Sequence, residues 1–208
     1  MISKKRNIIC PIIAAFILIS TTTSADTWKV PKSENYFSKN LKFRFRVIPL
    51  SSKGKDLSDK STMEFSKCTG IMEIQNEKGE YNLIWKQTLS NDVTPVSGLV
   101  TNNGEYVVTF DNHHSMGYGN NVVVIYGPDG SIIRQLALKD FLSDNEIAQL
   151  PHTISSIWWH DNKHHFDQDE KLLILVIRLA SDVPKVEEKN VQYKEIHIRL
   201  VTGEVIKK

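Results

Sequence analysis

The sequence predicts a mainly β protein that contains three four-stranded antiparallel meanders and one short helix near residues 144–150. Short runs rich in Val, Ile, Phe, Tyr and Leu alternate with Gly, Asn, Asp and Pro, as strands alternate with turns. This pattern recurs three times, over approximately residues 36–89, 95–138 and 153–207. Such internal repetition indicates that one supersecondary unit is repeated along the chain.

The second repeat shows the pattern most clearly. The expected elements are strands over 95–100, 105–110, 121–126 and 131–138, with turns over 101–104 and 127–130. The turn residues Asn and Gly tolerate positive φ, and Pro presets the first turn angle. The sequence Gly127-Pro128-Asp129-Gly130 between two apolar runs is therefore a strong hairpin signal.

The first and third repeats follow the same order more loosely. In the first, the turn residues Ser38-Lys39-Asn40 precede expected strands over 42–48, 70–75 and 81–89. In the third, we expect an opening strand over 153–160, a turn over 167–170, and further strands over 172–179, 195–201 and 204–207. The alternation of apolar and basic residues over 42–47 indicates that one face of that strand is solvated.

One helix is expected between the second and third repeats. Ser143 and Glu146 have the spacing of a capping box, in which each side chain binds a backbone N–H at the other position. The helix should end near Leu150, because the residue before Pro151 disfavours helical angles.

The segments Tyr106–Phe110, Val122–Tyr126 and Ile132–Leu136 resemble β-propeller blades of the YVTN and WD40-like kind. The stretches Thr109–Asn112 and Gly117–Gly119 are also similar to those of exported bacterial proteins. The chain lacks the Trp-Asp signature of WD40 blades, so the resemblance is one of architecture. Closed propellers usually have about four to eight blades. Three blades therefore imply a single curved β domain with protected edges, a sandwich or barrel, or a homodimer that pairs through its sheet edges.

The N-terminus has the features of a secretory signal. Three basic residues, Lys4, Lys5 and Arg6, precede an apolar run over 8–19, and small residues follow at 23–25. We expect residues 1–25 to be removed and residues 26–208 to form one exported β domain, periplasmic or extracellular. The alternative is an uncleaved anchor, but a membrane-spanning helix needs about 20 apolar residues, so no stable membrane insertion is expected after cleavage.

Removal of this signal changes the charge of the chain. The full sequence has 26 Lys and Arg against 24 Asp and Glu, and residues 1–25 hold three of the bases and no acid, which leaves 23 − 24 = −1. This balance does not favour nucleic acid as a partner. Cys68 is the one cysteine beyond residue 25, so no internal disulfide forms in the exported chain, and we expect a buried, inert thiol.

The loop over 111–121 is the most unusual stretch. Asp111, His113 and His114 are residue types that bind metals or move protons, and Tyr118 and nearby glycines suit a ligand contact. The competing interpretation is a wide polar connection, since adjacent side chains on an extended segment face opposite sides. His152, after the helix, should lie at the same end of the sheets as His113 and His114.

A second cluster covers residues 158–167. Its histidines and aspartates suit zinc or calcium, yet 167–170 aligns with the earlier turns, where acids need no ligand. One of Trp158 and Trp159 should pack in the core and the other is a candidate peptide or sugar platform, with Trp159 among our candidate binding residues. If this cluster joins the first two strands of its repeat, it lies opposite the 111–121 loop and the two cannot form one site.

Function is predicted only in outline. No nucleophile elbow, phosphate loop, dinucleotide fingerprint or zinc-protease motif occurs. We expect a non-enzymatic binding or structural module that presents loops from a β scaffold to a protein, peptide or glycan, without a cofactor or resident metal. The alternative is a secreted metal-dependent hydrolase that uses Asp111, His113, His114 and His152.

Overall fold

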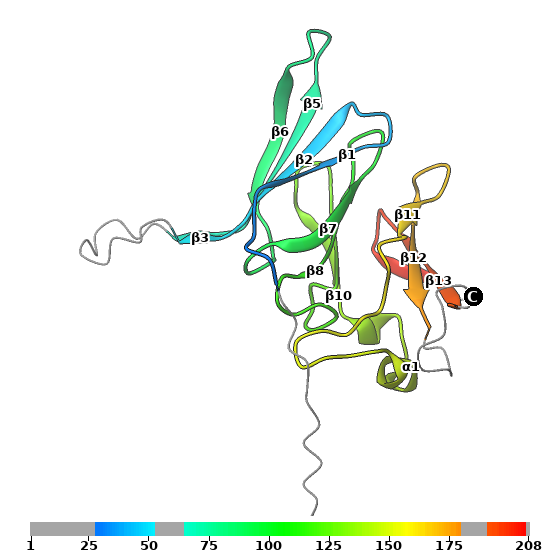
Figure 1. Cartoon of the computed structure of the whole chain (residues 1–208). Helices are drawn as coiled ribbons and strands as arrows, with labels where there is room; N and C mark the ends of the chain where they lie inside the picture. The colour runs from blue at the N-terminus through cyan, green and yellow to red at the C-terminus, as the bar shows by residue number, and fades with distance from the viewer. Residues whose placement is uncertain (1–27, 53–64, 180–190, 207–208) are drawn as a thin grey trace, which may run out of the picture.

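The structure, a computed structural model, describes residues 28–52, 65–179 and 191–206. The predicted signal over 1–25 lies outside these residues. The described chain is mainly β, with three four-stranded antiparallel sheets and one short α-helix (Figure 1). No helix within these ranges is long and apolar enough to cross a membrane.

Each of the three sheets is a meander of strands that follow one another in the chain. The N-terminal sheet contains β1 (Glu34–Phe37), β2 (Phe43–Ile48), β5 (Thr69–Gln75) and β6 (Tyr81–Thr88), and the small hairpin of β3 (Ser51–Ser52) and β4 (Phe65–Ser66) lies between β2 and β5. The middle sheet contains β7 (Pro95–Val100), β8 (Val107–Asn112), β9 (Val123–Tyr126) and β10 (Ile132–Leu136). The C-terminal sheet contains β11 (His165–Phe166), β12 (Leu172–Arg178), β13 (Tyr193–Arg199) and β14 (Glu204–Ile206). The three predicted meanders are confirmed.

The turn between the first two strands is the same in every sheet. Its first residue is Ser38, Thr101 or Asp167, and the side-chain oxygen of each accepts the backbone N–H five residues later, at 2.9–3.0 Å. The fourth residue of each turn has a positive φ: 62° at Leu41, 71° at Gly104 and 52° at Glu170. The predicted alignment of these three turns is therefore correct.

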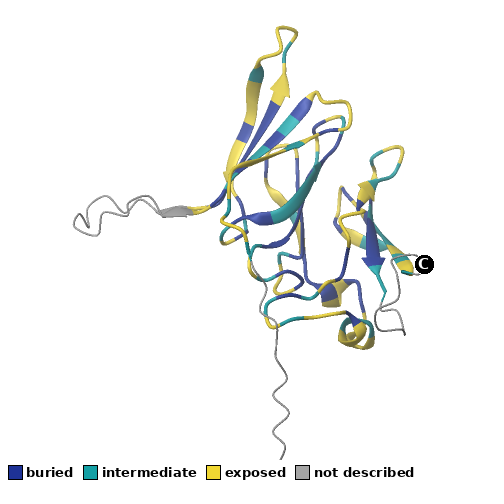
Figure 2. Ribbon diagram, in the orientation of Figure 1, coloured by how far each residue is buried: buried dark blue, intermediate teal, exposed yellow. Residues whose placement is uncertain are grey.

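The middle sheet packs against both of the other two, and its central strands β8 and β9 are buried throughout (Figure 2), whereas its edge strand β10 is largely exposed. Along β9, Val124 and Tyr126 pack against the N-terminal sheet, whereas Val123 and Ile125 pack against the C-terminal sheet. Since successive strand residues face opposite sides, a strand covered on both faces is apolar throughout. Both faces of the middle sheet thus belong to the core.

The outer face of the N-terminal sheet carries a polar cluster on β2 and β5. Glu73 accepts hydrogen bonds from Arg44 at 2.8 Å and Arg46 at 3.3 Å, and the Arg44 guanidinium lies 3.7 Å from the ring centre of Tyr81. These arginines alternate with the buried Phe43, Phe45 and Val47 along β2, as the sequence predicts. A polar outer face is what a terminal repeat needs when nothing further stacks on it.

The helix and its cap match the prediction. α1 spans Asp144–Gln149, the Ser143 side chain accepts the N–H of Glu146, and the Glu146 carboxylate accepts the N–H of Ser143. A short 3-10 helix, η1 (Leu138–Asp140), precedes it.

The expected strand over 153–160 does not form. The segment turns back on itself, because Thr153 N–H bonds to Ser156 O and a single bridge pairs His152 with Ile157. The C-terminal sheet opens instead with β11, at His165–Phe166. Ile157 and Trp159 instead contact residues of 111–121, since Ile157 donates its N–H to Met116 O and Trp159 donates its indole N–H to Asp111, whereas Ile154 and Trp158 are exposed.

Candidate functional site: an inner groove along β7

The 111–121 loop and the segment before β11 are joined by the Asp111 carboxylate. Asp111 is fully buried and accepts the indole N–H of Trp159 at 3.0 Å, Nε2 of His160 at 2.9 Å and the backbone N–H of Gly117 at 2.7 Å. Buried carboxylates require such donors, since an unpaired buried charge is costly. The two predicted clusters therefore meet, and their predicted separation to opposite ends is wrong.

The reason lies in the order of the elements. Trp159 and His160 precede the first strand of the C-terminal sheet and do not follow it. In a meander, the connection that enters the first strand and the loop between strands two and three lie at the same end. Because the C-terminal sheet begins only at β11, His160 lies at the same end of the sheets as Asp111.

The protonation of His160 follows from its hydrogen bonds. Asn162 donates its backbone N–H to Nδ1 at 3.0 Å, so this nitrogen is an acceptor and Nε2 carries the proton that Asp111 accepts. His160 is thus the neutral tautomer, with both nitrogens bonded within the protein. The pair of Asp111 and His160 stabilises the joined loops and leaves no free nitrogen for acid–base chemistry.

The other candidate residues occupy different places. Trp159 is fully buried and presents no free ring face, whereas Trp158 is exposed. Tyr118 and His152 are exposed, and His152 Nδ1 lies 3.2 Å from the carbonyl of Leu150. Within the described ranges, no three His, Cys, Asp or Glu side chains gather as metal ligands would.

His113 and His114 contact the start of the described chain. The Trp28 ring packs edge-on against His113 at 4.9 Å and His114 at 5.4 Å between ring centres. His113 Nε2 donates to the carbonyl of Lys29 at 2.9 Å. Burial lowers the pKa of His113, so its ring is neutral near pH 7. These contacts fix the segment 28–32 beside the middle sheet.

Three cavities lie in series along β7. The first, of about 890 Å³, is lined by Pro95 and Val96; the second, of about 90 Å³, by Ser97, Gly98 and Leu99; and the third, of about 610 Å³, by Leu99 and Val100. Every residue of β7 thus borders open space, and we call the three cavities together the inner groove. Most of its other lining residues come from β1, the segment 28–32 and the chain from Asn162 to Glu170, and the rest are Lys39, Thr94, Asn102, Phe110 and His113.

The backbone of β7 is unpaired on its groove side, because β7 is the last strand of its sheet. Thr101 N–H bonds to Tyr106 O, which marks a hydrogen-bonded pair, and such pairs alternate along an antiparallel ladder. The N–H and C=O groups of Gly98 and Val100 therefore point away from β8. Within the described residues, no hydrogen bond to these groups is formed.

One end of the inner groove is fixed by contacts among the three repeated turns. Asn40 donates its side-chain amide to Asn102 O at 2.8 Å. Asn102 in turn donates its backbone and side-chain N–H groups to the Glu170 carboxylate, both at 2.6 Å. These bonds hold β1, β7 and β11 close together where each enters its turn.

His164 lines two of the three cavities. Its ring is about 93% buried, from a relative exposure of 7%, and packs between Phe110 and Trp159 at 4.5 and 4.9 Å. Val176 donates its backbone N–H to Nδ1, so Nε2 carries the proton, and Nε2 has no partner in the described structure. Burial lowers the pKa of His164 to about 2, with smaller contributions from His160 and His165. His164 is therefore a neutral donor.

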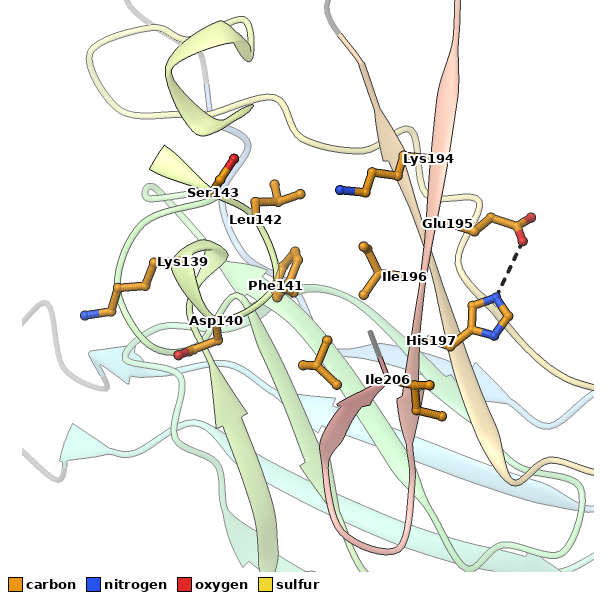
Figure 3. A pocket seen from close by; sticks show the side chains of 11 residues that line it. Lys139, Asp140, Phe141, Leu142, Ser143, Lys194, Glu195, Ile196, His197 and Ile206 are labelled. Carbon is orange, nitrogen blue, oxygen red and sulfur yellow. Dashed lines mark ion pairs between the residues drawn. The ribbon is translucent and has the colours of Figure 1, made fainter. Parts of the chain in front are cut away.

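A separate pocket of about 450 Å³ lies between η1, the segment 141–143 that follows it, and strands β13 and β14 (Figure 3). Lys194 and Ile196 extend from β13 toward Phe141 and Ser143, whereas Glu195 and His197 extend from the opposite face of the strand. Lys194 is already bonded to Glu146 at 2.5 Å. The pocket thus offers an apolar floor but no unpaired buried polar group on its own side of β13.

Comparison of the chain with protein-family models, with curated proteins and with solved structures found no match.

The sequence did not indicate the inner groove. Of our candidate residues, His113 lines it and Asp111 and Trp159 hold the segment that leads to Asn162 and His164. Trp28, Phe37 and Leu99 were not among them, and His164 was a candidate only for a metal site in the 158–167 cluster. The alignment of the three turns was the one available signal, since it implies that the first strands of the repeats converge.

Proposed function

We propose that this chain is an exported, non-enzymatic binding module and that its ligand is an extended polypeptide segment of a partner protein. The segment lies in the inner groove beside β7. The observation that carries the proposal is that all six residues of β7 border a cavity while, among the described residues, no strand is hydrogen-bonded to β7 on that side. An unpaired strand edge is a ready partner for another chain, and strand addition is a recurring mode of peptide recognition.

The groups in the groove support a polypeptide. Gly98 and Val100 offer backbone donors and acceptors at the two-residue spacing of a strand. Phe37 and Leu99 provide apolar contacts for side chains, and the buried, unpaired Nε2–H of His164 lies in the same wall of the groove. A strand of about six residues spans roughly 20 Å, the length of β7 itself.

The export part of the proposal rests on the basic, apolar and small-residue regions over 1–25. N-terminal sequencing of the protein recovered from its natural location tests it. The expected first residue is Asp26. Recovery of a chain that begins at Met1 would overturn the export proposal and, with it, the charge of the working chain.

The binding proposal is tested by selecting linear heptapeptides from a displayed random library on the purified protein. Amide hydrogen exchange is then measured by NMR for β7, with and without a selected peptide. In the free protein, Gly98 and Val100 should exchange much faster than Leu99, whose N–H is bonded to β8. The peptide should slow exchange at Gly98 and Val100 at least tenfold and leave Leu99 unchanged.

A matched pair of variants separates the groove from exposed apolar surface in general. Phe37 is 47% exposed on edge strand β1 and lines the groove, whereas Leu83 is 62% exposed on edge strand β6 and does not. Phe37→Asp should weaken peptide binding at least tenfold, and Leu83→Asp should not. Equal effects, or selected peptides that leave Gly98 and Val100 exchange unchanged, would overturn the proposal. So would a dimer, seen by sedimentation, that protects these amides without peptide.

A further inference from the structure

Charge is distributed unevenly along the inner groove. The cavity beside Pro95 is lined by Lys29, Lys32 and Glu34, which gives a formal charge of +2 − 1 = +1. His113 in the same cavity is neutral near pH 7, because burial lowers its pKa. Glu34 already accepts the hydroxyl of Tyr36 at 2.6 Å. The two lysines form no ion pair within the described residues, so this end of the groove is free to attract an anion.

The opposite end carries the opposite sign. The cavity beside Val100 is lined by Lys39, Asp167 and Glu170, which gives +1 − 2 = −1, and the adjoining His164 is neutral. Asp167 accepts the backbone N–H groups of Lys171 and Leu172, and Glu170 accepts the backbone and side-chain N–H groups of Asn102. All of these N–H groups are uncharged. Within the described chain, neither carboxylate is paired with a cation, so their charges remain available.

The two ends act separately on a ligand. They lie at the first and last residues of β7, about 20 Å apart by strand geometry, whereas charges are screened over about 8 Å at physiological salt. A ligand that spans the groove therefore meets a cationic environment at one end and an anionic one at the other. This arrangement favours one orientation of a segment whose own ends differ in charge.

We propose that the groove takes an extended segment of about six residues, antiparallel to β7, with an acidic residue beside Lys29 and Lys32 and a basic residue beside Asp167. The residues between them are apolar or β-branched, because Leu99 lines both the middle cavity and the cavity beside Val100, where Phe37 and Phe166 also lie. Antiparallel pairing is slightly more stable per residue than parallel pairing, and it places the basic residue first in the segment. The inference rests on the proposed function.

The contacts at the Lys29 end also explain how the cationic residues reach β7. They come from the segment 28–32, which Trp28 and the bond from His113 to the Lys29 carbonyl hold in place. The loop over 111–121 thus contributes to specificity indirectly, by positioning a basic segment at the entrance of the groove.

The test uses two capped hexapeptide pools on the immobilised protein. One pool has Lys first and Glu last, the other has Glu first and Lys last, and the four central positions are mixtures of Val, Ile, Thr and Tyr. Retained peptide is quantified by mass spectrometry. Exposed ion pairs contribute only modestly to binding, so the Lys-first pool should be retained about fivefold more strongly.

Charge variants assign this preference to the groove. Replacing both Lys29 and Lys32 by Glu should abolish or reverse it, and Asp167→Asn should reduce it about twofold while the side-chain oxygen that caps the turn is kept. Lys139→Glu is the matched control, because Lys139 lines the separate pocket at η1.

The outcomes separate the two proposals. Equal retention of both pools with protection of Gly98 and Val100 would overturn the charge inference and leave the binding proposal standing. A stronger Glu-first pool would overturn the antiparallel arrangement. Retention of neither pool, with no change in exchange along β7, would count against the binding proposal itself.

Discussion

The Asp111 carboxylate accepts the indole N–H of Trp159 at 3.0 Å across a sequence separation of 48 residues. This bond ties the end of β8 to the segment that enters the C-terminal sheet. His160 and Asn162 follow directly, so the same contact determines where Asn162 and His164 line the inner groove. Loop geometry and groove geometry therefore depend on one buried side chain.

Asp111→Asn tests this dependence. The amide keeps one acceptor but presents an N–H group to donors that need an acceptor, so at least one buried hydrogen bond is lost. The donors concerned are the buried N–H groups of Gly117, Trp159 and His160, which bind the carboxylate in the wild-type protein. Loss of these bonds should lower the free energy of unfolding by about 3 kcal/mol. Urea denaturation followed by tryptophan fluorescence measures it. Asp129→Asn, in an exposed turn, is the control and should change stability by less than about 0.5 kcal/mol.

Gly117 and Gly119 provide a second comparison within the same loop. Both glycines have a positive φ, 76° at Gly117 and 79° at Gly119. A Cβ atom added at Gly117 would lie 2.7 Å from Ile157 Cβ, whereas a Cβ atom added at Gly119 would have no neighbouring atom within 4 Å. Gly119→Ala should cost about 1 kcal/mol, from backbone strain alone. Gly117→Ala adds a clash between the joined loops and should cost about 3 kcal/mol. Equal unfolding free energies for the two variants would contradict the close contact of Gly117 with Ile157.

Much of the fold follows from local sequence signals. Turn residues such as Thr101 and Asp167 bind their own backbone, and the capping box of Ser143 and Glu146 is complete within four residues. These features need no distant partner, so the sequence alone predicts them. The alternation of apolar residues likewise reports which strands have one solvated face.

The candidate site depends on contacts that no local pattern contains. Residues 153–160 have the apolar composition of a strand, yet Trp159 and His160 bind Asp111 and the backbone bends instead. The groove exists because three sheets stack in a particular order and converge at Asn102. The sequence pattern assigned Trp159 and His160 to a strand and Asp111 to a loop, whereas the structure has Asp111 in β8, and no local pattern predicts how these segments meet.

Lys194 links α1 to β13, and its removal should have a small, pH-dependent effect. Lys194 bonds to Glu146 at 2.5 Å, and hydrogen bonds from Lys194 and Ser143 lower the pKa of Glu146 to about 2. A carboxyl pKa below its unfolded value contributes stability above that value, and this stability is lost as pH falls from about 4.5 to 2. Both side chains are partly exposed, so Lys194→Ala should cost about 0.5 kcal/mol at pH 7. Thermal unfolding of wild type and variant at pH 7 and pH 3 would show a smaller difference at the lower pH.

His164 makes the folded protein sensitive to mild acid. Burial lowers its pKa to about 2 in the folded state, whereas the unfolded side chain has an ordinary value near 6.5. Between these values the unfolded chain binds the additional proton, so stability is complete above about pH 6.5 and declines as pH falls. The expected loss at pH 5 is about 2 kcal/mol.

Replacement of His164 by Gln removes this titration and keeps a side-chain acceptor for the Val176 N–H. Urea denaturation at pH 7, 6 and 5 should show a shallower decline for His164→Gln than for wild type, although His164→Gln is less stable at pH 7. His165→Gln is the control, because the neighbouring ring is exposed. If both variants keep the wild-type slope, His164 does not remain neutral in the folded protein, and its Nε2–H is not the neutral donor assigned to the groove.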